Sequence, residues 1–401
     1  MKTLVIMGGG VNQVPLIKAS LDMGYHTVLC DANPQAYARD LADEFVVLDI
    51  SDAGLLTELC REKKADGIIC NTESLMEVLA DVQTQCGFVG NTVDAVRNIN
   101  DKYRFRGVQR KAKVFSPELE RFDKYADLQE YAQNLNYGVI LKPEMCSGSR
   151  GVAVFASPAD ITEEAFEVCA KYSRNHYVMV EQFIDFSSQP ALEAEMFVRD
   201  GKLQLLCLFR TLRDKKRNIL PQCYCADNEL DPQTEQRVRD ELQNIISVSG
   251  IQFGEYNVEL SFNNEGEIFV IEINARQGGM MLPDFVHIYT NIDINKLLVS
   301  TAVNDLSYEQ SLDMNADKWN KNCIHFRVLT DKSGTYQGYT MTPESEKYVA
   351  KRFSYSCPGD TIHCSDNNYS TVELLDFVLP DKDTRKKYEQ LLFDAVSVKM
   401  N

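Results

Sequence analysis

The first hundred residues alternate short apolar stretches with amphipathic ones, and this alternation limits the fold more than any other feature. The apolar stretches are TLVIM at 3–7, HTVLCD at 26–31, DEFVVLD at 43–49 and DGIICN at 66–71. Segments with helical spacing lie between them, VPLIKASLDMG at 14–24 and AGLLTELCREKKA at 53–65. Short apolar strands that alternate with helices are typical of a parallel sheet covered by helices on both faces. We therefore expect a Rossmann-like α/β domain over residues 1–98.

The next two hundred residues favour antiparallel pairs of strands instead. Strand-like runs are joined by short turns in 139–155, in 192–213 around Asp200 and Gly201, and in 255–276 around 264–266. Helical spacing is found at 98–112, 125–138, 159–173, 231–250 and 293–304. Hairpins separated by helices indicate an α+β unit over residues 99–300. Residues 301–401 contain the short strand-like runs IHFRVL, YVAKRF and GDTIHC, which predict a small β-rich accessory subdomain.

Composition and charge exclude several classes of protein. A chain of 401 residues suits two or three domains. Its net charge of −17 argues against a general nucleic-acid binder, which needs a basic face. No apolar stretch approaches the roughly 20 residues of a membrane helix, so no membrane partner is expected. The 12 cysteines form no CxxC pair and no signal peptide precedes them, so we expect reduced thiols in a cytoplasmic protein.

Polar side chains alternate along the apolar run IFVIEINARQGG at 268–279. Strand side chains alternate between faces, so Glu272, Asn274 and Arg276 share one face, and the hairpin places Glu259 opposite residues 271–273. Facing carboxylates repel each other unless a cation lies between them. Oxygen ligands without His or Cys favour Mg²⁺ bound together with substrate phosphates. The alternative interpretation is a solvated outer face on which glutamate and arginine form ion pairs.

Two glycine-containing turns are further candidates for phosphate binding. Lys142 lies on a strand that leads into Ser147-Gly148-Ser149-Arg150-Gly151, whose backbone N–H groups suit phosphates although the P-loop pattern is absent. GGG at 8–10 follows the first strand, and Asp31 ends the second, as in dinucleotide-binding domains. The GxGxxG spacing is missing, and a plain turn explains either segment as well. Glu73 either holds a substrate amine or caps the helix that follows it.

The order of these segments resembles that of the ATP-grasp superfamily over residues 1–300. The segments are NDK at 100–102, LKP at 141–143, SGSRGV at 147–152, VEQFI at 180–184, and NVEL at 257–260 followed by VIEINAR at 270–276. The resemblance is greatest to the carboxylate–amine ligases, including the L-amino-acid ligases and biotin carboxylase. It implies an α/β and α+β fold with a Rossmann-like N-terminal domain, a lid at about 112–180 and an antiparallel domain, with ATP between the last two.

The resemblance also implies roles for single residues. Nucleotide contacts are expected from Lys102, Lys142, the phosphate loop Ser147, Gly148, Ser149 and Gly151, and the adenine-binding residues Glu181, Gln182 and Ile184. The family usually places a ribose-binding glutamate seven residues after the adenine glutamate, but Ser188 stands there. We assign that role to Glu193, with Glu195 as its rival. Mg²⁺, or alternatively Mn²⁺, is expected on Glu259, Glu272 and Asn274. Arg276 is expected to be catalytic, and Arg210 is a weaker candidate for a second anion contact.

The implied reaction is the ATP-dependent, ADP-forming ligation of a carboxylate to an amine through an acyl phosphate. The expected partners are a small carboxylic acid or amino acid and an amine, and a homodimer is left open. A bicarbonate-using carboxylase of the biotin or purine type is the nearest alternative. A nucleotide-binding protein without catalysis is another, and an NAD(P)-dependent oxidoreductase leaves residues 259–276 unexplained. The sequence identifies neither the substrates nor the role of residues 301–401.

Overall fold

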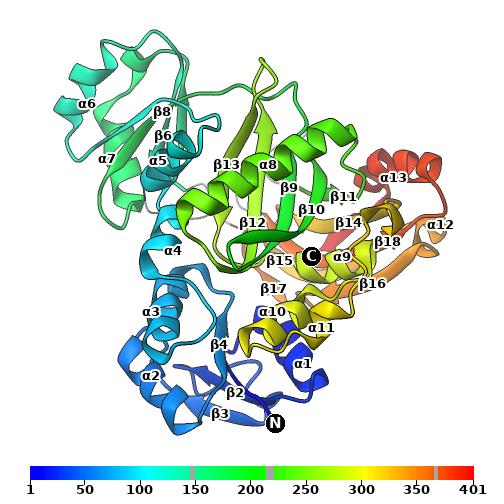
Figure 1. Cartoon of the computed structure of the whole chain (residues 1–401). Coiled ribbons are helices and arrows are strands. Elements are labelled where there is room, and N and C mark those ends of the chain that lie inside the picture. Colours follow the sequence, from blue (N-terminus) through cyan, green and yellow to red (C-terminus); the bar gives the residue numbers. More distant parts are fainter. Residues whose placement is uncertain (145–149, 214–220, 365–368) are drawn as a thin grey trace.

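The computed structural model describes residues 1–144, 150–213, 221–364 and 369–401, which form four sheets. Figure 1 shows the N-terminal domain in blue, the lid in teal at the upper left, the central sheet in green and the last strands in orange and red. The mixture of parallel and antiparallel sheets confirms the predicted α/β and α+β class. No helix in the described ranges is long and apolar enough to cross a membrane.

The N-terminal domain is a four-stranded parallel sheet of order β3-β2-β1-β4, as the alternation predicted. Its strands are β1 (Thr3–Met7), β2 (His26–Asp31), β3 (Glu44–Val47) and β4 (Gly67–Cys70). Its helices are α1 (Val14–Asp22), α2 (Ala53–Glu62), α3 (Met76–Cys86) and α4 (Val93–Asn100). The carboxyl ends of its strands face the rest of the molecule, where sheets of this kind bind ligands.

The segment predicted to be a lid is a four-stranded antiparallel sheet of order β5-β8-β6-β7 with its own apolar core. Its elements are β5 (Leu119–Phe122), α6 (Tyr125–Ala132), β6 (Val139–Pro143), β7 (Ala153–Phe155), α7 (Glu163–Tyr172) and β8 (Val178–Gln182). The predicted hairpin at 139–155 is confirmed, since Val139 pairs with Phe155. The helix α5 (Lys102–Ala112) connects the N-terminal domain to the lid.

The central sheet has eight strands in the order β13-β12-β9-β10-β11-β14-β18-β16. These are β13 (Ile268–Asn274), β12 (Phe253–Phe262), β9 (Leu192–Arg199), β10 (Lys202–Leu212), β11 (Cys223–Cys225), β14 (Cys323–Thr330), β18 (Ser370–Val378) and β16 (Val349–Ser354). The helices packed around it are α8 (Pro232–Ser249), α9 (Leu282–Thr290), α10 (Ile294–Ala302) and α13 (Lys382–Ala395). The remaining elements are α11 (Ser307–Gln310), α12 (Pro343–Glu346) and the sheet of β15 (Gly334–Thr340), β17 (Thr361–Ile362) and β19 (Ser397–Met400).

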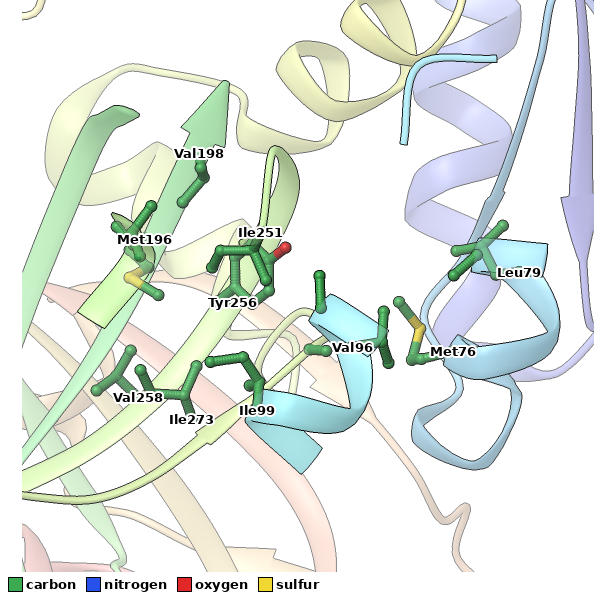
Figure 2. Packing of buried hydrophobic residues seen from close by; sticks show 14 of the residues in the cluster. Met76, Leu79, Val96, Ile99, Met196, Val198, Ile251, Tyr256, Val258 and Ile273 are labelled. Atoms are coloured by element: carbon green, nitrogen blue, oxygen red, sulfur yellow. The ribbon is translucent and has the colours of Figure 1, made fainter. Parts of the chain in front are cut away.

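One apolar cluster joins the N-terminal domain to the central sheet. Figure 2 shows Met76 of α3 beside Val96 of α4, and Ile99 of α4 beside Ile273 of β13. The backbones also approach closely, because a Cβ built on Gly67 in β4 lies 2.3 Å from the carbonyl oxygen of Ala302 in α10. Burial of this apolar surface fixes the strand ends of the N-terminal domain against residues 275–284.

Two predicted helices differ from the structure. The basic helix expected at 98–112 is two helices, because Asp101 between them is extended and its carboxylate accepts a hydrogen bond from the N–H of Arg104. An aspartate with this geometry is an N-cap, so it begins a new helix. The helix expected at 125–138 is shorter, since α6 ends at Ala132 and the chain then turns toward β6.

Candidate functional site

Three carboxylates lie side by side across the central sheet. Glu259 of β12 pairs with Glu272 of β13 on one side and with Glu193 of β9 on the other. This register confirms the prediction that Glu259 faces residues 271–273. The amide of Asn274 donates to Oε1 of Glu272 at 3.3 Å, and Nζ of Lys102 lies 3.9 Å from Oε2 of Glu272. The site thus gathers two of the predicted metal ligands, the third beside them, and one predicted nucleotide lysine.

Glu193, Glu259 and Glu272 form a row of carboxylates, and the electrostatics of this row favour a bound cation. Burial, followed by the charges of Glu272 and Glu193, raises the pKa of Glu259 from 4.5 to about 8. A divalent cation would offset this repulsion and keep the carboxylates ionised. Within the described ranges, no three His, Cys, Asp or Glu side chains gather as a metal site. The predicted donor set of two carboxylates and an amide oxygen suits a hard cation whose other ligands are phosphates and water.

Two of the residues predicted to contact the nucleotide, Lys142 on β6 and Glu181 on β8, bind each other. Nζ of Lys142 lies 2.6 Å from Oε1 of Glu181, and Nε of Arg106 donates to Oε2 of Glu181 at 2.8 Å. Burial raises the pKa of Glu181, but Arg106 and Lys142 outweigh it and lower the value to about 2. Burial lowers the pKa of Lys142. The Glu181 carboxylate is thus engaged within the protein.

The backbone that follows Glu181 in the lid also forms hydrogen bonds within the protein. The N–H of Gln182 donates to the carbonyl oxygen of Glu118 at 2.8 Å, and that of Phe183 donates to the carbonyl oxygen of Gly138. Ile184 follows directly and is half-buried. Of the predicted phosphate loop, Ser147, Gly148 and Ser149 lie outside the described residues. Gly151 has a φ of +71°, and a Cβ there would lie 2.8 Å from the ring of Tyr172, so this position requires glycine.

The two candidates for the ribose contact have different surroundings. Nδ2 of Asn257 donates to Glu193 at 2.9 Å and to Glu195 at 2.8 Å. Glu195 is fully buried, and its Oε2 accepts the N–H of Gly278 at 3.1 Å. Burial raises the pKa of Glu195 to about 7. Glu195 therefore supports the turn after Arg276, while Glu193 lies in the row with Glu259.

Arg276 connects the central sheet to the N-terminal domain. Its Nη2 lies 3.2 Å from Oε2 of Glu73, and its Nη1 donates to the carbonyl oxygen of Gln277 at 2.9 Å. Glu73 begins a 3-10 helix after β4, at the carboxyl edge of the parallel sheet. The Arg276 guanidinium is thus held at the junction of two domains, within the electrostatic field of Glu259 and Glu193.

Arg210 is not brought to this site. On β9 and β10, Glu193 pairs with Phe209, whereas Arg210 pairs with Leu192, so Arg210 lies on the opposite face of the sheet from the carboxylate row. Its Nη2 lies 2.6 Å from Oε2 of Glu389 in α13. The side chain therefore anchors the C-terminal helix in the described structure. Strand alternation excludes it as a contact for an anion bound on the face of Glu259.

Three arginines that the sequence analysis did not select contribute to this region. Arg106 binds Glu181. Burial raises the pKa values of Glu259 and Glu193, and the charges of Arg213 and Arg327 partly oppose these rises, at Glu259 and Glu193 respectively. Arg327 and His325 alternate with apolar residues in the strand-like run IHFRVL. The same alternation that identified Glu272 and Asn274 therefore gives a signal for Arg327. No local pattern distinguishes Arg106 from the other basic residues of α5.

A pocket of about 230 Å³ lies between the N-terminal domain and the turn that follows Arg276. Its lining consists of Asn12, Pro15, Asn71, Arg276, Gln277, Gly278, Gly279, Met280, Met281, Pro283, Asp284 and Asn295. Met280 and Met281 both adopt positive φ angles, 56° and 52°. Two successive non-glycine residues in this conformation are costly, and such strain concentrates at functional sites.

The glycine run at 8–10 forms a turn in which the backbone N–H groups of Gly8 and Gly9 already donate to acceptors within the protein. The N–H of Gly9 donates to Oδ2 of Asp31 at 2.7 Å, and that of Gly8 donates to the carbonyl oxygen of Cys30. Asp31 also accepts the N–H of Asn33 at 2.7 Å. Asp31 therefore stabilises the strand–helix turn, which is the plain interpretation of this motif.

Comparisons with known proteins find a family model that matches part of this chain. Residues 135–284 match the model of the ATP-grasp domain. Over 195 residues the chain is 27% identical to a formate-dependent phosphoribosylglycinamide formyltransferase of Prochlorococcus marinus (strain MIT 9303). That match covers 48% of this chain and 50% of the relative, so the chain spans about half the length of the curated relatives it matches.

Solved structures share the fold over the whole chain. An L-amino acid ligase from Bacillus licheniformis superposes with a TM-score of 0.80 at 19% identity, covering 100% of this chain and 99% of that one. A biotin carboxylase domain of the 2-oxoglutarate carboxylase from Hydrogenobacter thermophilus, a dimer in complex with MgADP, ADP and bicarbonate, superposes with a TM-score of 0.75. It is 17% identical, and the match covers 100% of this chain and 91% of that one. These likenesses establish the fold.

Proposed function

We propose that this chain is an ATP-grasp enzyme, an ADP-forming ligase that joins a carboxylate to an amine through an acyl phosphate, because residues 135–284 match the model of the ATP-grasp domain. The observation that carries the proposal is the pairing of Glu259 with Glu272, beside Lys102 and on the strand that leads to Arg276. Paired, half-buried carboxylates with cations at both ends suit the binding of a metal–triphosphate complex.

Glu259, Glu272 and Asn274 would hold Mg²⁺, with Mn²⁺ as the alternative, and ATP would bind between the lid and the central sheet. When bound, such an ion would offset the charge that develops on a transferred phosphoryl group. Lys102 lies beside Glu272 and supplies a further cation for the phosphates. Glu193, in the same row, is suited to accept hydrogen bonds from the ribose hydroxyls.

Arg276 has two tasks in the proposed reaction. A carboxylate oxygen of the substrate attacks the γ-phosphorus, the bond from that phosphorus to the ADP oxygen breaks, and an acyl phosphate forms. The fixed guanidinium of Arg276 stabilises the negative charge on the transferring group and orients the carboxylate. The amine then displaces phosphate. Glu73 and the Gln277 carbonyl hold Arg276 in place, which reduces the reorganisation needed during the reaction.

The lid protects the intermediate in this proposal. Acyl phosphates hydrolyse when water remains in the site, so closure of the lid over ATP controls the yield of the ligated product. The ion pair of Glu181 with Arg106 connects the lid strand β8 to α5, and the ion pair of Glu181 with Lys142 connects β8 to β6 within the lid.

Two other reactions fit the same nucleotide site. A carboxylase would use bicarbonate in place of an organic carboxylate, and a relative of this fold was solved with bicarbonate. A formate-using enzyme is a variant of the same chemistry, as the name of the curated relative indicates. Both alternatives retain ATP, the metal and Arg276 and differ in the small acid. A nucleotide-binding protein without turnover requires none of these substrates.

The test is ADP release from Mg²⁺–ATP across amino acids, small carboxylates, formate and bicarbonate. We expect ADP formation that depends on both an acid and Mg²⁺ in the wild type. Glu272→Gln should reduce it at least about 100-fold, because one metal ligand loses its charge. Glu265→Gln, in the exposed turn of the same hairpin, is the matched control and should retain activity. Turnover that survives Glu272→Gln would contradict the metal assignment, and ATP binding without any turnover would identify a binder.

A further inference from the structure

We propose that Glu255 carries a proton on Oε1 and donates it in a hydrogen bond to Glu195, and that this acid pair positions the turn after Arg276. Glu255 lies on β12 and Glu195 on the neighbouring strand β9. The inference rests on the proposed function, because it makes the two glutamates positioning residues for Arg276. The proton itself can be tested without any turnover.

The register of the central sheet brings the two carboxyl groups together. Asn257 on β12 pairs with Glu195 on β9. Glu255 lies two residues before Asn257 on the same face, so it is the diagonal neighbour of Glu195. Both glutamates are buried, and their carboxyl groups are hydrogen-bonded to each other. Since an ionised carboxylate only accepts hydrogen bonds, this contact requires a proton on one of the two.

The other hydrogen bonds of the pair place that proton on Glu255. Oε1 of Glu195 accepts the amide of Asn257 at 2.8 Å, and Oε2 accepts the N–H of Gly278 at 3.1 Å. Both oxygens of Glu195 thus face donors, as an ionised carboxylate requires. Oε2 of Glu255 accepts Nε2 of Gln277 at 2.6 Å, whereas its buried Oε1 receives no hydrogen bond from the described residues. A proton on that oxygen gives it a partner in Glu195.

Burial keeps the proton on Glu255. It raises the pKa of Glu255 well above 4.5, and the charge of Glu195 adds to the rise. Burial also raises the pKa of Glu195, to about 7. Ionising Glu255 beside an ionised Glu195 would place two negative charges in contact inside the protein, so Glu255 holds the proton that remains.

The groups around the pair do not offset a second negative charge. The charged and titratable groups that face it are Glu193 on β9, Cys207 on β10, Asp293 before α10, and Cys70 on β4 and Arg276 on the turn, which line the same small cavity as Glu255. The guanidinium of Arg276 is bound by Glu73. The remaining groups of this set are acids or thiols, which favour the protonated form of Glu255.

The acid pair connects the turn to the row of carboxylates. It binds Gln277 and Gly278, the two residues that follow Arg276. The N–H of Asn257 donates to the carbonyl oxygen of Arg276 at 3.0 Å, and its side chain donates to Glu193 at 2.9 Å. Hydrogen bonds therefore run without a break from the turn to the row. Loss of the proton would disturb this chain and move Arg276, and a shift of about 1 Å can cost about 100-fold in rate.

Two glutamine variants separate the proton from the charge. Glu255→Gln places an amide N–H where the acid has its O–H, and its oxygen still accepts from Gln277, so both contacts survive. Glu195→Gln turns one of its two acceptors into a donor that meets Asn257 or Gly278, so one contact is lost. Because the turn keeps its position only in the first variant, we expect kcat within about 3-fold of wild type for Glu255→Gln and at least about 10-fold lower for Glu195→Gln.

The first measurement is infrared spectroscopy at pH about 9, where exposed carboxyl groups are ionised and an acid C=O band reports buried protonated ones. Glu255→Gln should remove the intensity of one carboxyl group from this band. Glu265→Gln, in the exposed turn at 264–266, is the control and should leave the band unchanged. Circular dichroism checks that each variant is folded.

The second measurement is kcat against pH for ADP release, with the acid that gives the fastest turnover in the panel above. The kcat of the wild type should fall at alkaline pH as Glu255 loses its proton, and Glu255→Gln should remove that fall. An unchanged acid band in Glu255→Gln, or equal losses of kcat in Glu255→Gln and Glu195→Gln, would overturn the inference. Failure of the proposed function looks different: no acid supports ADP release by the wild type, while Glu255→Gln still loses the acid band, which supports the proton on Glu255.

Discussion

At the scale of single residues, the most consequential contact is the buried carboxylate of Glu181. It is 1% exposed and lies between Arg106, which is 2% exposed, and Lys142. Removing one partner of a buried ion pair leaves an uncompensated charge, here two cations with no anion between them. This cluster joins α5 to two strands of the lid, so its loss affects both stability and the nucleotide site.

Glu181→Gln should destabilise the protein by about 3–5 kcal/mol, because Arg106 and Lys142 lose their counter-charge in a buried site. Urea unfolding measures the free energy. Glu77→Gln is the matched control, because it breaks the exposed ion pair with Arg97 and should cost at most about 1 kcal/mol. Similar losses in the two variants would show that the buried cluster carries no special weight.

Glu195 and Glu255 make stability depend on pH. Burial raises the pKa of Glu195 from 4.5 to about 7 and that of Glu255 well above its ordinary value. Between pH 4.5 and about pH 7, Glu195 keeps its proton in the folded protein but has released it in the unfolded chain. Stability therefore falls as pH rises through this window, by up to about 1.4 kcal/mol per pH unit for Glu195.

Glu195→Gln should flatten this decline, because the amide does not titrate. Unfolding free energies of wild type and variant, measured by urea titration between pH about 5 and about 8, test the expectation. The wild type should lose more stability than the variant as pH rises. Parallel curves for the two proteins would contradict a titrating Glu195.

At the scale of elements, the turn after β13 determines where Arg276 and the pocket lie. A Cβ built on Gly278 lies 2.1 Å from Oε1 of Glu195, whereas one built on Gly279 meets nothing within 4 Å. The two neighbouring glycines therefore differ sharply in what they tolerate. The buried Glu195 carboxylate is the reason, since its Oε2 also accepts the Gly278 N–H.

Gly278→Ala should lower the free energy of unfolding by about 1–3 kcal/mol, because overpacking displaces the Glu195 carboxylate. Gly279→Ala should change it by less than about 1 kcal/mol, since open space surrounds that position. Thermal and urea unfolding of both variants compare the two. Equal stability of the variants would show that the turn shifts freely.

Much of these elements could be predicted from the sequence, because strand alternation carries information about both faces. The register of Glu259 against Glu272 followed from hairpin geometry and the turn at 264–266. The same reasoning could not place Arg210, whose face depends on how β10 pairs with β9. The sequence pattern also could not separate α4 from α5, because the residues around the break at Asp101 have a composition similar to that of the two helices.

At the scale of the whole molecule, the last hundred residues extend the central sheet. The strands β14, β18 and β16 follow β11 in the same sheet, with Cys223 paired to Phe326. The sequence predicted β-rich structure there but gave no means of seeing that it continues the sheet, because strand pairing over long separations leaves no local pattern. Because β14 belongs to this extension, the charge of Arg327 lies close enough to Glu193 to influence the pKa of that carboxylate.

Removal of residues 301–401 should therefore leave a protein that does not fold stably. The truncation exposes the edge of β11 and leaves the buried Cys223 and Cys225 without their apolar partners Ile324 and Phe377, and unpaired strand edges promote aggregation. Size-exclusion chromatography and circular dichroism of the truncated chain measure this. A soluble, monomeric and cooperatively folding fragment would show that residues 1–300 are independent of the extension.

The acyl phosphate is the central claim, and transfer of heavy oxygen tests it most directly. The protein is incubated with Mg²⁺–ATP, an amine and an acid that supports ADP formation, with heavy oxygen in the carboxylate of that acid. The released phosphate is then analysed by mass spectrometry. Attack of the carboxylate on the γ-phosphorus beside Arg276 predicts that one labelled oxygen appears in each phosphate released with product. Product formation with unlabelled phosphate would contradict the account.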